Sequence, residues 1–82
     1  MADVIYTNTF LAVFSELSAR EQAMIVDSAE YLKTFPEMFK RVETGRFRGS
    51  RVFAAGNWLV YYQYRSGAVY LRNIWPARIP YR

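Results

Sequence analysis

Two small-residue dipeptides divide the second half of the chain into three short runs, and this spacing constrains the fold more than any other feature. The runs "SRVFAA" and "WLVYYQYR" flank Gly56-Asn57, and "AVYLRNIW" follows Ser66-Gly67. Apolar residues recur with period two in these runs, and small residues at two-residue turns are typical of β-hairpins. The pattern therefore predicts a three-stranded antiparallel meander. Pro76 and Pro80 close it, because proline cannot donate to a β-ladder.

Strict alternation along the last of these strands predicts which side chains share a face. We expect one face to carry Val69, Leu71 and Trp75, and the other to carry Tyr70, Arg72 and Ile74.

The first half of the chain has helical periodicity after a short strand at Asp3–Thr7. The segment "TFLAVFSEL" from Thr9 places apolar residues at helical spacing, which predicts a first helix. Ser18 and Glu21 have the spacing of a capping box, so a second helix begins there. It should continue until Pro36, because the residue before a proline avoids the helical region.

The segment from Pro36 to Ser50 predicts a loop with room for one helical turn at Glu37–Arg41. The element order is then β-α-α-β-β-β within a single domain, residues 1–82. This order predicts an α+β fold: a short N-terminal strand and a helical hairpin packed on one face of an antiparallel C-terminal sheet. The other face of the sheet is left open.

Several classes of function are excluded by residues that the chain lacks. It has no cysteine and no histidine, so no thiolate or imidazole is available as nucleophile, base or metal ligand. We therefore expect no metal and no cofactor. No apolar run reaches the roughly 20 residues of a membrane span, and the start "MADVIYTNTF" lacks a signal-peptide pattern. We expect a cytoplasmic protein that does not bind membranes.

Charge is distributed unequally between the two halves. Residues 1–39 have two cations and six acids, a net charge of −4, whereas residues 40–82 have nine cations and only Glu43 as an acid, a net charge of +8. Eight of the nine cations are arginine, which favours recognition of phosphate, carboxylate or nucleobase. The segregation predicts an acidic face on the helical layer and a cationic face on the sheet.

The second half, "RGSRVFAAGNWLVYYQYRSGAVYLRNIWPAR", resembles the RelE/ParE superfamily of toxins from bacterial type II toxin–antitoxin pairs. That family has an arginine opening a strand, a glycine-containing turn, an aromatic residue, a "VY" strand, a second tight turn and a basic residue after the last strand. The matching residues in order are Arg51, Gly56-Asn57, Trp58, Val60-Tyr61, Gly67 and Arg78. The helical hairpin ending in "FP" and the basic loop extend the resemblance over nearly the whole chain.

The resemblance implies a toxin that is held inactive by a cognate antitoxin, whose C-terminal segment wraps the toxin surface. It also implies one of two targets. RelE-like relatives cut messenger RNA on the ribosome, and ParE-like relatives poison DNA gyrase. The two branches share the fold and differ in the chemistry of its open face.

The residues available for proton transfer favour the ParE-like branch. Arg51 and Arg78 match the arginines of the nuclease branch, but Pro76 stands where many of its members have histidine. In a nuclease the remaining proton carriers would be Tyr81, whose phenol has an ordinary pKa near ~10, and Glu43, which as a lone acid among arginines is more often a surface ion-pair partner. Gyrase poisoning needs binding alone. We therefore expect a gyrase poison, with a ribosome-dependent mRNA endoribonuclease as the alternative.

Two further interpretations remain open: a non-toxic module that binds a partner strand, and an inactive toxin relative. For binding of a target or antitoxin we expect one cationic surface made by Arg46, Arg48, Arg51, Arg72, Arg78 and Arg82. Arg65 is interpreted as a solvated turn residue. The aromatic residues expected in the core and in cross-strand pairs are Phe47, Phe53, Trp58, Tyr61, Tyr62 and Tyr64.

Overall fold

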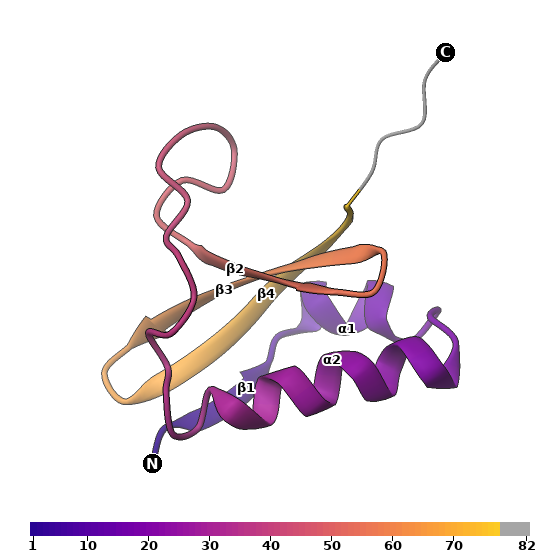
Figure 1. Ribbon diagram of the computed structural model, residues 1–82, viewed down its shortest axis with the longest axis horizontal. Helices are drawn as coiled ribbons and strands as arrows, with labels where there is room; N and C mark the ends of the chain where they lie inside the picture. Colours follow the sequence, from indigo (N-terminus) through magenta and orange to yellow (C-terminus); the bar gives the residue numbers. More distant parts are fainter. Residues whose placement is uncertain (78–82) are drawn as a thin grey trace.

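The computed structural model describes residues 1–77 and confirms the predicted α+β fold (Figure 1). Its elements are β1 (Asp3–Tyr6), α1 (Asn8–Phe14), α2 (Ala19–Tyr31), β2 (Arg51–Ala55), β3 (Trp58–Arg65) and β4 (Ala68–Pro76). Within this part of the chain, neither helix has the length and apolar character that a membrane crossing requires.

The sheet contains the predicted meander and one additional strand. The strand order is β1-β4-β3-β2, and the β2–β3 and β3–β4 pairs are antiparallel, as the turn dipeptides indicate. The N-terminal strand β1 lies parallel to β4, with Val4 opposite Val69 and Tyr6 opposite Leu71. The tight turn at Ser66-Gly67 has φ of +51° and +79°, the paired positive values that a type I′ hairpin turn requires.

A β-bulge in β4 changes the predicted side-chain alternation. Tyr62 lies opposite Leu71, but the preceding Tyr61 lies opposite Asn73, so Arg72 is an extra residue in β4. The expectation that Trp75 shares the Val69 face, and Ile74 the opposite one, is therefore wrong. Ile74 is buried with Val69, and Trp75 is 39% exposed.

Both helices cover one face of the sheet and leave the other face to a loop (Figure 1). They run in opposite directions in this view, with α1 packed on β4 and α2 on β2. The core between these layers contains Ala2, Phe10, Ile25, Ala29, Leu32, Phe53, Ala55, Val60, Tyr62, Val69, Leu71 and Ile74.

The end of α2 differs from the prediction. The helix ends at Tyr31 and does not continue to Pro36. Its last turn tightens into i→i+3 bonds, from the Lys33 N–H to the Glu30 carbonyl and from the Thr34 N–H to the Tyr31 carbonyl. The Lys33 carbonyl accepts the Ala2 N–H at 2.8 Å, which ties this turn to the N-terminus.

The segment after Pro36 also differs from the prediction of a helical turn. Residues 36–40 form turns and bends, and Arg41 then forms an isolated β-bridge with Arg51. The Val52 N–H donates to the Lys40 carbonyl at 3.2 Å, so backbone pairing with the start of β2 takes the place of a local helix.

The predicted capping box at the start of α2 is present and extends to the sheet. Glu21 Oε1 accepts the Ser18 N–H at 3.1 Å, and the Ser18 hydroxyl accepts the Glu21 N–H. Glu21 Oε2 also accepts the Trp58 indole N–H at 2.8 Å, which links the helix to β3. The indole donor and the Ser18 N–H lower the pKa of the Glu21 carboxyl, because both stabilise its charged form.

Because the folded-state pKa of Glu21 is lowered, its contribution to stability should disappear in acid. That contribution is present above the ordinary pKa of 4.5 and is lost as the pH falls through the lower folded-state value. We expect the melting temperature of Glu21→Gln to fall less between pH 7 and pH 3 than that of the unmodified chain. Thermal melts followed by circular dichroism at pH 7 and at pH 3 measure the fall in melting temperature of each chain. Equal falls would contradict the prediction, and Glu16→Gln is the control at an exposed position.

Candidate functional site

The loop between α2 and β2 closes on itself and folds onto the open face of the sheet. The Val42 N–H donates to the Ser50 carbonyl at 2.7 Å, and the Gly49 N–H donates to the Val42 carbonyl at 2.9 Å. A further bond of 3.2 Å joins the Arg48 N–H to the Gly45 carbonyl. We call residues 42–50 the basic loop, and these bonds give it a defined shape.

Phe47, at the tip of the basic loop, anchors it to the sheet. Its ring stacks on that of Tyr61, with 4.1 Å between the ring centroids and 25° between the planes. It also meets the Trp75 ring edge-on at 5.7 Å. The Arg46 guanidinium lies 5.3 Å from the Trp75 ring centroid, in cation–π range. Phe47, Tyr61 and Trp75 form the aromatic cluster of the open face.

Beside the aromatic cluster, three arginines surround one pocket of about 260 Å³. Arg46 and Arg48 come from the basic loop, and Arg72 comes from the bulge in β4. We call this the arginine pocket. Its lining residues are Arg46, Phe47, Arg48, Ser50, Gln63, Arg72 and Asn73.

The arginine pocket has a strong excess of positive charge. Arg46, Arg48 and Arg72 are all exposed, and within residues 1–77 none of them forms an ion pair with a carboxylate. Arg72 Nη1 donates to Gln63 Oε1 at 3.0 Å, which holds one guanidinium against the sheet. Three planar donor groups around one hollow suit an anionic group such as a carboxylate or a phosphate.

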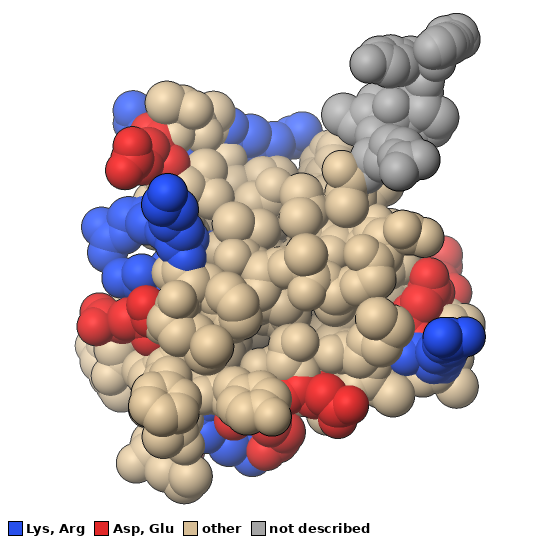
Figure 2. All heavy atoms as spheres, viewed as in Figure 1, with Lys and Arg blue, Asp and Glu red and all other residues tan. Residues whose placement is uncertain are grey.

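The wider surface shows only part of the predicted charge segregation. In Figure 2 the blue atoms of Lys and Arg gather mainly at the upper left, around the basic loop. Acids occur along the helices and also beside these cations. On the face seen in Figure 2, the cations are therefore densest around the basic loop.

Arg51 does not join the other predicted site residues. Its Nη1 donates to the Phe39 carbonyl at 2.9 Å and to the Glu37 carbonyl at 3.4 Å, and its Nη2 lies 3.6 Å from Glu37 Oε2. It also lies on the same face of β2 as buried Phe53, opposite the arginine pocket. These contacts fix the segment before the basic loop, so Arg51 has a structural role.

Of the predicted site residues that remain, the structure describes only Glu43. Glu43 is exposed on the basic loop and is not among the pocket's lining residues. Arg78, Tyr81 and Arg82 lie outside the described residues. Arg65, interpreted as a solvated turn residue, is exposed, with its guanidinium 5.4 Å from the Tyr70 ring centroid.

Sequence reasoning missed two amides of the pocket and misplaced two rings. Gln63 and Asn73 line the pocket, and the position of Asn73 depends on a bulge that no local pattern indicates. Phe53 and Tyr62 are buried as predicted, but Phe47 and Tyr61 stack on the open face. The glycines on either side of Phe47 indicate turns in the loop, but no local pattern identifies Tyr61 as the ring on which Phe47 stacks.

Comparison with known proteins gives no assignment: no protein-family model and no curated protein matches the chain. The resemblance to the RelE/ParE superfamily therefore stays a prediction from the sequence.

Proposed function

We propose that this chain is the toxin of a type II toxin–antitoxin pair, ParE-like, which acts in the cytoplasm by binding and poisoning DNA gyrase. The support is the combination of the ordered sequence resemblance with an α+β fold whose open sheet face carries the arginine pocket. The observation that carries most weight is the gathering of Arg46, Arg48 and Arg72, which come from two distant segments of the chain.

The chemistry of the arginine pocket favours binding over catalysis. Its lining offers guanidinium, amide and hydroxyl groups, together with one aromatic ring. These groups donate hydrogen bonds to an anion, but none of them accepts a proton readily near neutral pH. A protein that acts by holding its target needs only to donate hydrogen bonds to it and does not need to accept a proton. No cofactor or metal enters this proposal.

The same pocket suits a cognate antitoxin, which would hold the toxin inactive. An acidic C-terminal segment that wraps the surface would neutralise the excess charge of the three arginines. A short reading frame that overlaps the upstream end of this gene, and whose co-expression restores growth, is expected.

The experiment that tests gyrase as the target uses purified protein and relaxed plasmid. We expect inhibition of gyrase supercoiling together with accumulation of the cleaved gyrase–DNA complex. Unchanged supercoiling at a large molar excess of the chain would reject gyrase as the target.

A second candidate is a ribosome-dependent mRNA endoribonuclease, and the aromatic cluster favours it. The exposed Trp75 ring, with the Arg46 guanidinium 5.3 Å from its centroid, could stack a base while the arginine pocket binds the phosphate. Primer extension on translating ribosomes distinguishes the two candidates, because position-specific cuts by purified protein belong to the nuclease alone. Absence of both activities would favour the non-toxic binding module or the inactive relative.

A further inference from the structure

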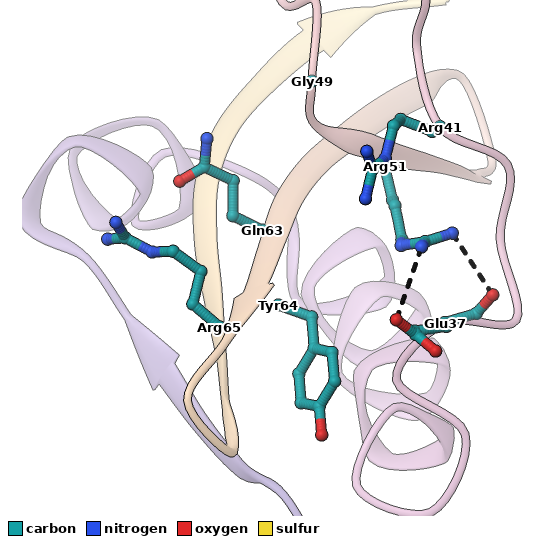
Figure 3. A pocket seen from close by; sticks show the side chains of 7 residues that line it. All are labelled: Glu37, Arg41, Gly49, Arg51, Gln63, Tyr64 and Arg65. Atoms are coloured by element: carbon teal, nitrogen blue, oxygen red, sulfur yellow. Dashed lines mark hydrogen bonds and ion pairs between the residues drawn. The ribbon is translucent and has the colours of Figure 1, made fainter.

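A second hollow lies at the point where β2 separates from β3 (Figure 3). It has a volume of about 180 Å³, and we call it the edge notch. Its lining residues are Glu37, Arg41, Gly49, Arg51, Gln63, Tyr64 and Arg65. In Figure 3 the side chains of Gln63 and Arg65 point away from Arg51 and Glu37, so the backbone of β3 faces the notch.

The edge notch exposes a stretch of β3 backbone on its β2 side. Pairing of β2 with β3 ends at Arg51 opposite Tyr62, because the chain turns away at Gly49, whose φ is +93°. Beyond that pair, residues Gln63 to Arg65 are paired with β4 alone among the described strands.

Register identifies the backbone groups that are available there. Hydrogen-bonded and non-hydrogen-bonded pairs alternate along an antiparallel ladder. Arg65 and Ala68 close the two-residue turn and form a hydrogen-bonded pair, so the next pair, Tyr64 with Val69, is not hydrogen-bonded. The N–H and C=O of Tyr64 therefore point away from β4 and into the edge notch.

The charges around these backbone groups are mainly positive. Arg41 is exposed and has no carboxylate partner within residues 1–77. Arg41 and Arg51 are bridge partners, which places their side chains on one face of the sheet, the face of Tyr64. The carboxylate of Glu37 lies 3.6 Å from Arg51 Nη2 and is well exposed.

We propose that the edge notch binds an extended segment of a partner protein, with one acidic residue opposite Tyr64. The backbone of that residue would exchange two hydrogen bonds with Tyr64, and its carboxylate would face Arg41 and Arg51, replacing Glu37. The inference goes beyond the proposed function, because it concerns neither gyrase nor RNA and uses none of the three arginines of the arginine pocket; Gln63 alone lines both hollows.

The N–H and C=O of Tyr64 that point into the edge notch favour a peptide over a nucleic acid or a free phosphate. A nucleic acid or a free phosphate would satisfy the guanidinium groups, but it would leave the N–H and C=O of Tyr64 without strand-like partners. An extended peptide satisfies both at once, as strands do when they add to an open sheet edge.

The test is an NMR titration of the full ¹⁵N-labelled chain with the peptide acetyl-TVEVT-amide. We expect the largest shift changes at the Tyr64 amide and at neighbouring residues of β3. Replacing the peptide glutamate by glutamine should weaken binding about threefold, the loss of one exposed charge pair. N-methylation of the glutamate amide should also weaken binding, because it removes one of the two backbone hydrogen bonds.

Three variants of the chain sharpen the test. Arg41→Gln should weaken binding of acetyl-TVEVT-amide about threefold, whereas Glu37→Gln should strengthen it about twofold by removing the competing carboxylate. Arg20→Gln, which removes a charge from α2, should leave binding unchanged.

Four results would overturn the inference: no binding, shift changes confined to the arginine pocket, equal binding of the glutamine peptide, or weaker binding by Glu37→Gln. Stronger shift changes at Tyr64 with an oligonucleotide than with the peptide would assign the notch to nucleic acid instead.

Discussion

Tyr62→Ala should destabilise the protein by about 3–5 kcal/mol, the usual cost of removing a fully buried aromatic ring. Tyr62 is 0% exposed at the centre of the sheet, and its ring lies 6.1 Å from that of Phe53. Its hydroxyl donates to the Pro36 carbonyl at 2.8 Å, and burial raises the pKa of Tyr62, so it remains a neutral donor. Because small domains are stabilised by only about 5–15 kcal/mol in total, this loss is a large fraction of the free energy of unfolding.

Urea denaturation followed by circular dichroism measures this loss, and Tyr31→Ala is the matched control. Tyr31 is 64% exposed at the end of α2, so its removal should change the free energy of unfolding by less than about 0.5 kcal/mol. Tyr62→Phe should lose about 1 kcal/mol, the contribution of the hydrogen bond to Pro36. Similar losses for Tyr31→Ala and Tyr62→Ala would contradict the placement of the core.

Replacing Arg46, Arg48 and Arg72 together by glutamine should abolish inhibition of gyrase. If each guanidinium contributes about 1.4 kcal/mol to target binding, the concentration for half-maximal inhibition rises about 10³-fold. All three side chains are exposed, so the melting temperature should change little. The supercoiling assay gives the inhibition, and circular dichroism shows that the variant is folded.

A charge-matched variant separates this effect from a general loss of positive charge. Replacing Arg20, Lys33 and Lys40 by glutamine changes the net charge from +4 to +1, as the first triple variant does, but leaves the arginine pocket intact. Inhibition by this control should stay within about twofold of the unmodified chain. Equal loss of inhibition in both variants would show that net charge alone is responsible.

The parts of the fold predicted from the sequence depend on local signals. The turn residues at Ser66-Gly67 satisfy the backbone angles of a tight hairpin, so the meander follows from their spacing. The Ser18–Glu21 pair likewise fixes the start of α2 with contacts three residues apart. Such signals indicate which strands are neighbours in the meander. The open face follows from the element order, because the one helical hairpin covers only one face of the sheet.

The candidate site depends on contacts that no local pattern contains. The bulge at Arg72 reverses the alternation of β4, so Trp75 moves from the predicted core face to the aromatic cluster. Phe47 reaches Tyr61 across the sheet because the basic loop closes on itself. The charge of Arg51 and its place at the start of a strand predict that it joins the cationic surface, whereas carbonyl groups on the other face of the sheet hold it.

Induction of the chain in growing bacteria tests the proposed toxin role most directly, with a DNA-damage reporter and incorporation of labelled methionine followed in parallel. We predict growth arrest in which the reporter rises while protein synthesis continues. Undiminished growth at a confirmed level of folded protein, or a halt in protein synthesis before any reporter signal, would contradict the proposal.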